Sequence, residues 1–243
     1  MYDFQQSMIT EQKIEKAVCE AIKTTITKFR EHPYYFFTES DIHSYFYRCV
    51  YCKNFECVRN GKRIYLIHRE YPTNFRYHKK DLPKPNCSEP IPLDKKEGVR
   101  GRYDLAVLHP KFAQQAPSCK DIVNKEVGLL GKRVKNLELT RTELLCAIEF
   151  KYIIKNAEGY VESIKADNKK LHFSKMCEQK SKHAFNLVFC NIPDGKYIEG
   201  AKRAISNAPS DVHAFFVQSY YDGNKKITPL PIEKKAEGTL CLL

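Results

Sequence analysis

The chain has 243 residues, of which 42% are hydrophobic and 12% aromatic, a composition that supports one sizeable core and excludes a disordered chain. No stretch approaches the ~18 uncharged apolar residues of a membrane span, and the first residues lack a secretory signal, so we expect a soluble, cytoplasmic protein without a membrane partner. The formal net charge of +12 favours a polyanionic partner such as nucleic acid, although solvated lysines also produce such an excess.

Two amphipathic helices are expected within residues 11–52. Residues 11–30 carry apolar side chains at spacings of three and four, and the second helix begins near Thr38, which is a favoured N-cap residue. Glu39 and Asp41 follow in its first turn, where acids interact favourably with the helix dipole. We interpret both acids as capping residues, with assistance to a catalytic site as the alternative.

The ten cysteines, in a chain without a secretory signal, indicate reduced thiols rather than a disulfide framework. Cys49 and Cys52 form a pair, with Cys57 close behind and Cys87 further on, and four thiolates can bind zinc. The alternative is that these cysteines are small buried side chains, as free cysteines commonly are.

A β-hairpin is predicted from residues 55–59 and 62–68, because Asn60-Gly61 between them is a strong turn signal. Glu70 follows where the second strand leaves the sheet. It is either a third acid of a catalytic site or an edge residue paired with Arg69 or Arg102. The polar region 73–100, rich in Pro and Lys, is predicted as a surface loop.

Asp104 lies at the polar start of a second apolar strand, residues 101–108. After it, residues 111–141 are predicted as a long insertion with mixed helical signals, including a helical pattern at 121–130. The basic side chains of this insertion either line a nucleic-acid groove or form a solvated face, and the solvated face is the preferred interpretation.

The stretch 144–152 is strongly apolar apart from Glu149 and Lys151, which predicts a central strand of the sheet. Side chains alternate between the two faces of a strand, so Glu149 and Lys151 share one face, and Cys146, Ile148 and Phe150 share the other. A carboxylate and an ammonium group therefore lie side by side in the predicted sheet.

The later elements alternate between helix and strand: a helix at 166–180 with Asp167 or Asn168 near its cap and Lys169, Lys170 and Lys175 on it, a strand at 184–190, a helix at 197–207, a strand at 212–218, and a polar tail at 225–243 with one short edge strand. We expect a single domain over residues 1–243, with its core at 55–218. Its fold class is α/β, with a mixed central β-sheet flanked by helices.

Two carboxylates and a lysine on adjacent strands are suited to phosphodiester hydrolysis. Mg²⁺ prefers oxygen ligands and takes only one or two carboxylates from a protein, a requirement that Asp104 and Glu149 meet. A bound metal lowers the pKa of a water molecule and offsets charge in the transition state. Lys151 then orients the attacking water, helps to deprotonate it if its pKa is depressed, or stabilises the developing negative charge.

The order of these elements, with Arg102-Tyr-Asp104-Leu on one strand and Ile148-Glu-Phe-Lys151 on the next, resembles the PD-(D/E)XK nuclease superfamily. The likeness covers residues 38–218, which fit a core of helix, three strands, helix and strand. Tyr103 replaces the family's proline, and the 45 positions between the two acids imply an insertion.

The resemblance implies a restriction-endonuclease-like core, Asp104 and Glu149 as metal ligands, Lys151 as the catalytic lysine, and Mg²⁺ as cofactor, with Mn²⁺ as the alternative ion. It also implies a DNA substrate and is compatible with a homodimer. Glu70, Glu39 and Lys169 are candidates from position alone. The leading hypothesis is a Mg²⁺-dependent nuclease. The alternatives are an inactive nuclease-fold protein that binds nucleic acid or serves in an assembly, and a zinc-binding interaction protein.

Overall fold

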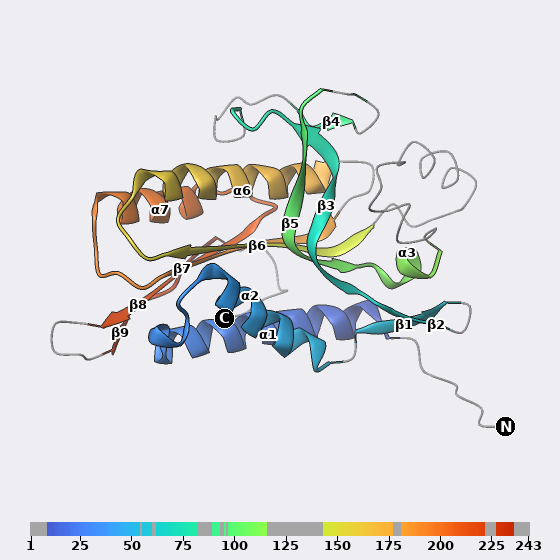
Figure 1. The fold of residues 1–243 in the computed structure, drawn as a ribbon, viewed down its shortest axis with the longest axis horizontal. Coiled ribbons are helices and arrows are strands. Elements are labelled where there is room, and N and C mark those ends of the chain that lie inside the picture. The colour runs from blue at the N-terminus through green and yellow to red at the C-terminus, as the bar shows by residue number, and fades with distance from the viewer. Residues whose placement is uncertain are drawn as a thin grey trace.

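The computed structural model describes residues 9–53, 55–59, 62–81, 89–92, 95, 97–115, 143–176, 181–221 and 227–235. Within these ranges the fold is mixed α/β, with an eight-stranded mixed sheet flanked by five α-helices (Figure 1). The predicted α/β class with a mixed central sheet is thereby confirmed.

The helices are α1 (Glu11–Glu31), the short 3₁₀ helix η1 (Pro33–Tyr35), α2 (Glu39–Tyr51), α3 (Pro110–Gln115), α6 (Glu158–Met176) and α7 (Lys196–Ser206). The strands are β1 (Glu56–Arg59), β2 (Lys62–Tyr65), β3 (Ile67–Tyr77), β4 (Ile91–Pro92), β5 (Val99–Leu108), β6 (Leu144–Ile153), β7 (Ser181–Cys190), β8 (His213–Tyr221), β9 (Ile227–Pro229) and β10 (Glu233–Lys235).

The main sheet has the strand order β10-β8-β7-β6-β5-β3-β4, and β9 pairs with β8. Strands β3, β5 and β6 are antiparallel neighbours, whereas β6, β7 and β8 run parallel to one another. The helices α6 and α7 make the parallel connections between β6, β7 and β8, as parallel strands require. Strands β1 and β2 form the predicted hairpin as a separate two-stranded sheet.

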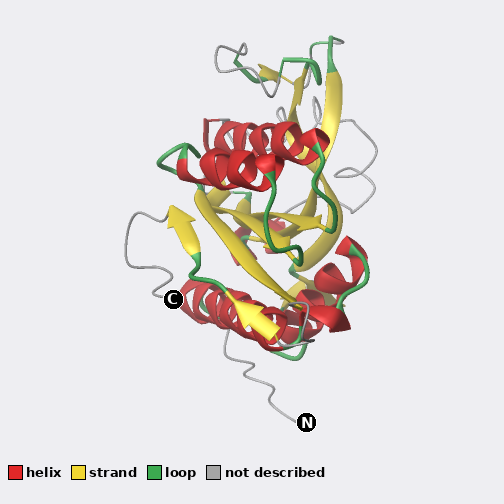
Figure 2. Cartoon of the chain, turned by 90° about the vertical axis from the view of Figure 1, so that its left-hand side faces the viewer, coloured by secondary structure: helices red, strands yellow, loops and turns green. Residues whose placement is uncertain are grey.

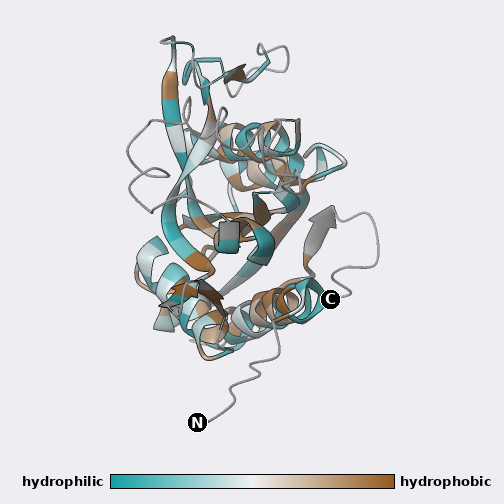
Figure 3. Ribbon diagram, turned by 90° about the vertical axis from the view of Figure 1, so that its right-hand side faces the viewer, coloured by the Kyte–Doolittle hydropathy of each residue, from teal (hydrophilic) through white to brown (hydrophobic). Residues whose placement is uncertain are grey.

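The sheet is covered on both faces, by α1 and α2 on one side and by α6 and α7 on the other (Figures 1 and 2). On the first face the ring of Phe29 in α1 packs 5.0 Å from Phe189 in β7. On the second face, Ile198 and Ile205 of α7 form a cluster with Val188. Apolar and polar residues alternate along these helices in Figure 3, in keeping with their amphipathic character.

The alternation predicted for β6 is observed. Phe150 packs against Phe46 of α2 at 5.3 Å between ring centroids, while Glu149 contacts Lys170 of α6 on the opposite face. β6 is flanked by β5 and β7 and is buried along most of its length, so the predicted central position is confirmed as well.

Two predictions about the boundaries of β3 were wrong. β3 continues through Pro72 to Tyr77, so residues 73–77 are strand rather than loop. The pairing of β3 with β5 shifts register between Pro72 and Arg76, and proline, which lacks an N–H donor, is tolerated at such irregularities. In addition, the predicted strand 62–68 divides at Leu66 into β2 and β3.

The helix predicted from residue 166 begins at Glu158, so Asp167 and Asn168 lie in the middle of α6 and not at its cap. Their polar side chains have partners across the fold instead. Asn168 Nδ2 donates to the Ala204 carbonyl at 2.9 Å, and Asp167 pairs with two lysines.

The two predicted N-terminal helices and the capping role of Asp41 are confirmed, whereas the Glu39 carboxylate accepts from Tyr152 N instead of capping the helix. The side chain of Thr38 accepts a hydrogen bond from the Asp41 amide, and the Asp41 carboxylate accepts one from the Thr38 amide, a reciprocal capping box. The predicted helical pattern 121–130 and most of the insertion 111–141 lie outside the described residues. Within the described ranges, no helix combines the length and apolar character needed to cross a membrane.

Candidate metal centre

The site begins where β5 and β6 separate. The two strands pair from Leu108 and Leu144 to Leu105 and Ile148, after which β6 continues beside β7 alone. Beyond this point, carboxylates bind the amides of β6 on the side away from β7. Phe150 N donates to Asp104 Oδ2 at 2.7 Å, and Tyr152 N donates to Glu39 Oε2 at 3.1 Å.

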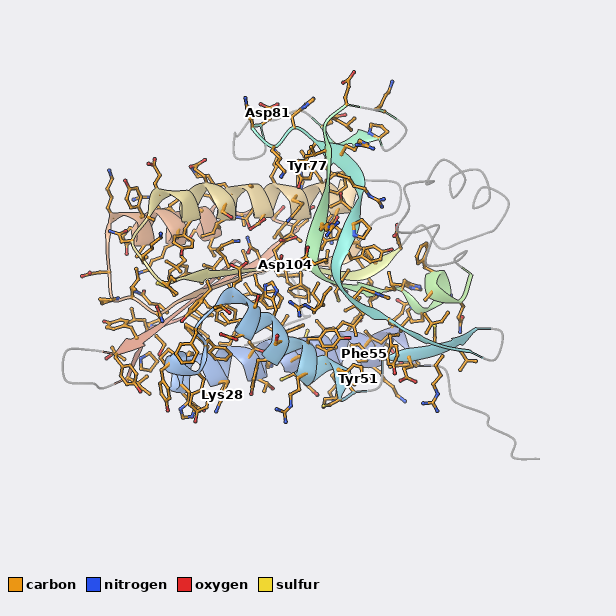
Figure 4. All side chains as sticks on the ribbon, in the orientation of Figure 1. Lys28, Tyr51, Phe55, Tyr77, Asp81 and Asp104 are labelled. Atoms are coloured by element: carbon orange, nitrogen blue, oxygen red, sulfur yellow. The ribbon has the colours of Figure 1, made fainter. Side chains whose placement is uncertain are left out.

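These bonds satisfy backbone donors that would otherwise be unpaired inside the protein. They also fix the position of two carboxylates from different elements, one at the start of α2 and one on β5. Figure 4 shows Asp104 in the middle of the molecule, between the layer of α6 and the layer of α2. The division of the sheet therefore brings acidic side chains together at its centre.

Three potential metal ligands converge at this division. One ligand atom each from Glu39, His43 and Asp104 lies within 4.8 Å of the other two. Glu39 and His43 are four residues apart on α2, so both project from the same face of the helix. His43 Nε2 lies 3.7 Å from Asp104 Oδ2 and has no hydrogen-bond partner, although only 8% of its side chain is exposed.

The electrostatics of His43 favour a metal-binding form of the ring. Burial lowers its pKa below the ordinary value of 6.5, and Asp104 opposes this effect. The imidazole is therefore neutral near pH 7, with a lone pair on one nitrogen. A buried nitrogen without a partner, beside two carboxylates, is the arrangement expected for a cation ligand.

Lys151 lies at the edge of this group. Its Nζ is 3.4 Å from Glu39 Oε2 and 3.8 Å from Asp167 Oδ2. Burial favours the neutral amine, but the surrounding acids outweigh it, Asp167 and Glu39 foremost, and the pKa of Lys151 is raised above 10.5. Lys151 is thus a protonated cation at neutral pH.

Glu149 has a different partner from the one the sequence predicts. Its Oε1 lies 2.7 Å from Nζ of Lys170, which also lies 3.3 Å from Asp167 Oδ1 and donates to the Arg102 carbonyl at 3.1 Å. The side chain of Glu149 is 2% exposed. Glu149 therefore lies in the same charged network as Asp104 but forms an ion pair with a lysine.

The network contains more acids than bases. The acids are Glu39, Asp104, Glu149 and Asp167, and the lysines are Lys151 and Lys170. When all are ionised, four negative charges face two positive ones. Burial raises the pKa values of Glu39, Glu149 and Asp167 above their ordinary range, and the negative charge of Asp104 adds to the rise in each. A divalent cation at the ligand group would balance this difference.

Glu70 is not one of the three converging ligands. Its side chain is 58% exposed and lies 4.0 Å from Arg102, the edge pairing that the sequence left open. The pairing of β3 with β5 on either side of it places Glu70 opposite Asp104, and its backbone has a φ of 51°. A catalytic role for Glu70 remains a prediction.

Several residues of the site were not predicted from the sequence. His43, Asp167 and Lys170 were not assigned to it, and Glu39 was interpreted as a capping residue. The spacing of four between Glu39 and His43, and of three between Asp167 and Lys170, places each pair on one helix face. Those spacings were the available signal. Lys169, the lysine singled out by position, lies with its amine 5.7 Å from the ring of Phe173.

The zinc hypothesis receives no support from the described residues. Cys49, Cys52 and Cys57 do not form a group of close ligand atoms there, and Cys87 lies outside those residues. No family model matches the chain, and comparisons with curated proteins and with solved structures also give no match.

Proposed function

We propose that this protein is a metal-dependent nuclease that hydrolyses phosphodiester bonds, with DNA as the expected substrate. The observation that carries the proposal is the convergence of Glu39, His43 and Asp104 where the sheet divides, with the Lys151 ammonium beside them. A metal site next to a fixed cation is suited to a phosphate group, which gains negative charge at its oxygens during hydrolysis.

The arrangement of elements supports the same class of enzyme. In chain order, α2, β3, β5, β6, α6 and β7 give helix, three strands, helix and strand, the order that the resemblance to PD-(D/E)XK nucleases implies, with the short elements β1, β2, β4 and α3 between them. Asp104 lies on the second of these strands, and Glu149 and Lys151 on the third. This order supports the restriction-endonuclease-like core and adds Glu39 and His43 from the helix.

The three ligands fit a divalent ion and indicate which ion it is. Mg²⁺ prefers oxygen ligands alone, whereas imidazole nitrogen is a good ligand for first-row transition metals. A set of two carboxylates and one imidazole therefore favours Mn²⁺ over Mg²⁺. We propose Glu39, His43 and Asp104 as the ligands. Glu149, which the sequence predicts as a ligand, is held by Lys170 in this arrangement.

The residues of the chain have distinct roles in the proposed reaction. A divalent ion, when bound, would lower the pKa of a water molecule and offset charge on the phosphate. Lys151, being protonated, stabilises negative charge on the phosphate oxygens or orients the water by donating to it. Because its pKa is raised, Lys151 does not act as the general base.

The second candidate function is binding of nucleic acid without cleavage. It is favoured by the ion pair of Glu149 with Lys170, which occupies the carboxylate that the resemblance implies as a metal ligand. This function predicts salt-sensitive binding and no cleavage with any divalent ion.

A cleavage assay separates these functions. Labelled single-stranded and duplex DNA, and RNA, are incubated with the protein and Mn²⁺ or Mg²⁺. We expect cleavage with Mn²⁺ that Asp104→Asn and Lys151→Met each reduce at least a hundredfold. Lys165→Met is the matched control, because Lys165 pairs with Glu162 on the exposed side of α6. Full activity of both site variants would exclude this site, and no cleavage with retained binding would favour the second function.

A further inference from the structure

Lys170 lies in a cage of oxygen atoms that resembles the surroundings of a bound cation. Its Nζ lies 2.7 Å from Glu149 Oε1, 3.1 Å from the Arg102 carbonyl oxygen and 3.3 Å from Asp167 Oδ1. The three oxygens come from β6, β5 and α6, so three separate elements contribute to one position. Lys170 is 8% exposed, and Glu149 is almost completely buried.

We infer that the cage formed by Glu149, Asp167 and the Arg102 carbonyl is a second cation site, and that Lys170 fills it permanently. The inference rests on the proposed metal centre, because it states how many ions the centre takes. Each protein chain then binds one divalent ion, at Glu39, His43 and Asp104, and the lysine ammonium replaces a second one.

The two cation positions are linked by a chain of ion pairs. Asp167 contacts Lys170 through Oδ1 and Lys151 through Oδ2, and Lys151 in turn contacts Glu39 of the ligand group. In nucleases with two metals, the ions lie ~3.5–4 Å apart and share a clamp of acidic ligands. Here Glu149 and Asp167 contact the Lys170 ammonium group instead of a second ion.

A lysine is suited to this position because it cannot dissociate from it. The acids around Lys170, Glu149 foremost, outweigh the effect of burial and raise its pKa above 10.5, so the ammonium form is favoured at neutral pH. The Lys170 ammonium balances the charge of Glu149, and Lys151 balances the charge of Asp167. The remaining charge deficit is that of one divalent ion.

The inference makes Glu149 a partner of Lys170 rather than a ligand. Glu149→Gln keeps an oxygen that can accept from Lys170 and removes one negative charge. We expect this variant to bind Mn²⁺ within about twofold of the wild-type affinity. Loss of tenfold or more would show that Glu149 is a ligand and would overturn the inference.

The direct test is the number of Mn²⁺ ions bound by the purified chain, measured by calorimetric titration without substrate. The wild-type chain is expected to bind one. Lys170→Met removes the ammonium, and its side chain ends one atom short of the Nζ position, so the cage becomes available and a second ion binds. Lys169→Met, at the preceding position of α6, is the matched control and is expected to bind one ion.

The outcomes separate the inference from the proposed function. Two ions in the wild-type chain, or one ion in a folded Lys170→Met chain, would overturn the role of Lys170 and leave the metal centre standing. No ion in the wild-type chain would overturn both. If Lys170→Met does not fold, the Glu149→Gln affinity and the wild-type stoichiometry decide the question.

Discussion

His43 is the residue that bears most on the identity of the metal. Its ring supplies the one nitrogen among the three proposed ligands, and its Nε2 has no hydrogen-bond partner. Replacement by Gln puts an amide oxygen near the reach of Nε2. We expect His43→Gln to weaken Mn²⁺ binding at least tenfold and to change Mg²⁺ binding less, because Mg²⁺ prefers oxygen.

Calorimetric titration of both ions into the wild-type and variant chains measures this preference. An unchanged ratio of the two affinities would show that His43 does not contact the ion. His68→Gln is a useful control, since that ring binds the Tyr65 carbonyl through Nε2 at 2.9 Å on a different element.

Glu143 gives the fold a pH dependence that is separate from the site. Burial raises its pKa to about 7, while a hydrogen bond from Tyr71 and the charge of Arg100 oppose the rise. A carboxyl group with a raised folded-state pKa binds its proton more tightly in the folded state. The free energy of unfolding therefore falls as pH rises from about 4.5, and the loss levels off above about 7.

Glu143→Gln removes this effect and keeps an oxygen that can accept the Tyr71 hydrogen bond. Between pH 5 and pH 8, the wild-type chain should lose about 2.5 kcal/mol of unfolding free energy relative to the variant. Urea denaturation of both chains across this pH range measures the difference. Parallel pH profiles would show that Glu143 does not titrate in this range.

Glu70 combines an exposed side chain with an unfavourable backbone conformation. A φ of 51° is easily adopted by glycine and costs other residues about 1 kcal/mol. We expect Glu70→Gly to be about 1 kcal/mol more stable than Glu70→Ala, since only glycine relieves the strain. Both variants should retain cleavage, because the carboxylate lies beside Arg102.

Chemical denaturation and the cleavage assay together test both parts of this prediction. Loss of cleavage in both variants, with stability intact, would identify Glu70 as the third catalytic acid that the sequence suggested.

At the scale of elements, the start of α2 determines where two of the proposed ligands lie. Thr38 caps this helix, Glu39 is its first residue and His43 follows one turn later. Thr38→Ala should cost about 1 kcal/mol of stability and should also weaken Mn²⁺ binding, because the first turn of the helix would fray. Thr10→Ala, at the cap of α1, should have a similar cost and leave Mn²⁺ binding unchanged.

Equilibrium unfolding and Mn²⁺ titration of both cap variants make this comparison. Equal metal affinity in the two variants would mean that the cap of α2 does not position the ligands.

The elements themselves were largely predictable from the sequence. β5 and β6 are largely apolar strands with three and two charged residues, and α1, α2 and α7 follow their periodic apolar positions. The start of α6 was not predictable, because Asp167 and Asn168 are residue types that commonly cap helices. Their partners lie on distant elements, and a sequence pattern does not contain those contacts.

At the scale of the molecule, the site depends on a feature that no local pattern encodes. β5 and β6 separate after Leu105 and Ile148, and two carboxylates take over the bonds to the amides of β6. Whether two strands remain paired depends on the packing of both faces of the sheet. Asp104 and Lys151 could be predicted as neighbours because they lie on adjacent strands. The choice of Glu39 as a ligand and the pairing of Glu149 with Lys170 could not be predicted, because they depend on how the helices pack on the sheet.

The position of the metal is the central claim, and anomalous diffraction from crystals containing Mn²⁺ tests it most directly. We predict one peak per chain, at about 2.0–2.3 Å from oxygens of Glu39 and Asp104 and from Nε2 of His43. A peak coordinated by Glu149 in place of His43, or crystals without an anomalous peak at this site, would contradict the account.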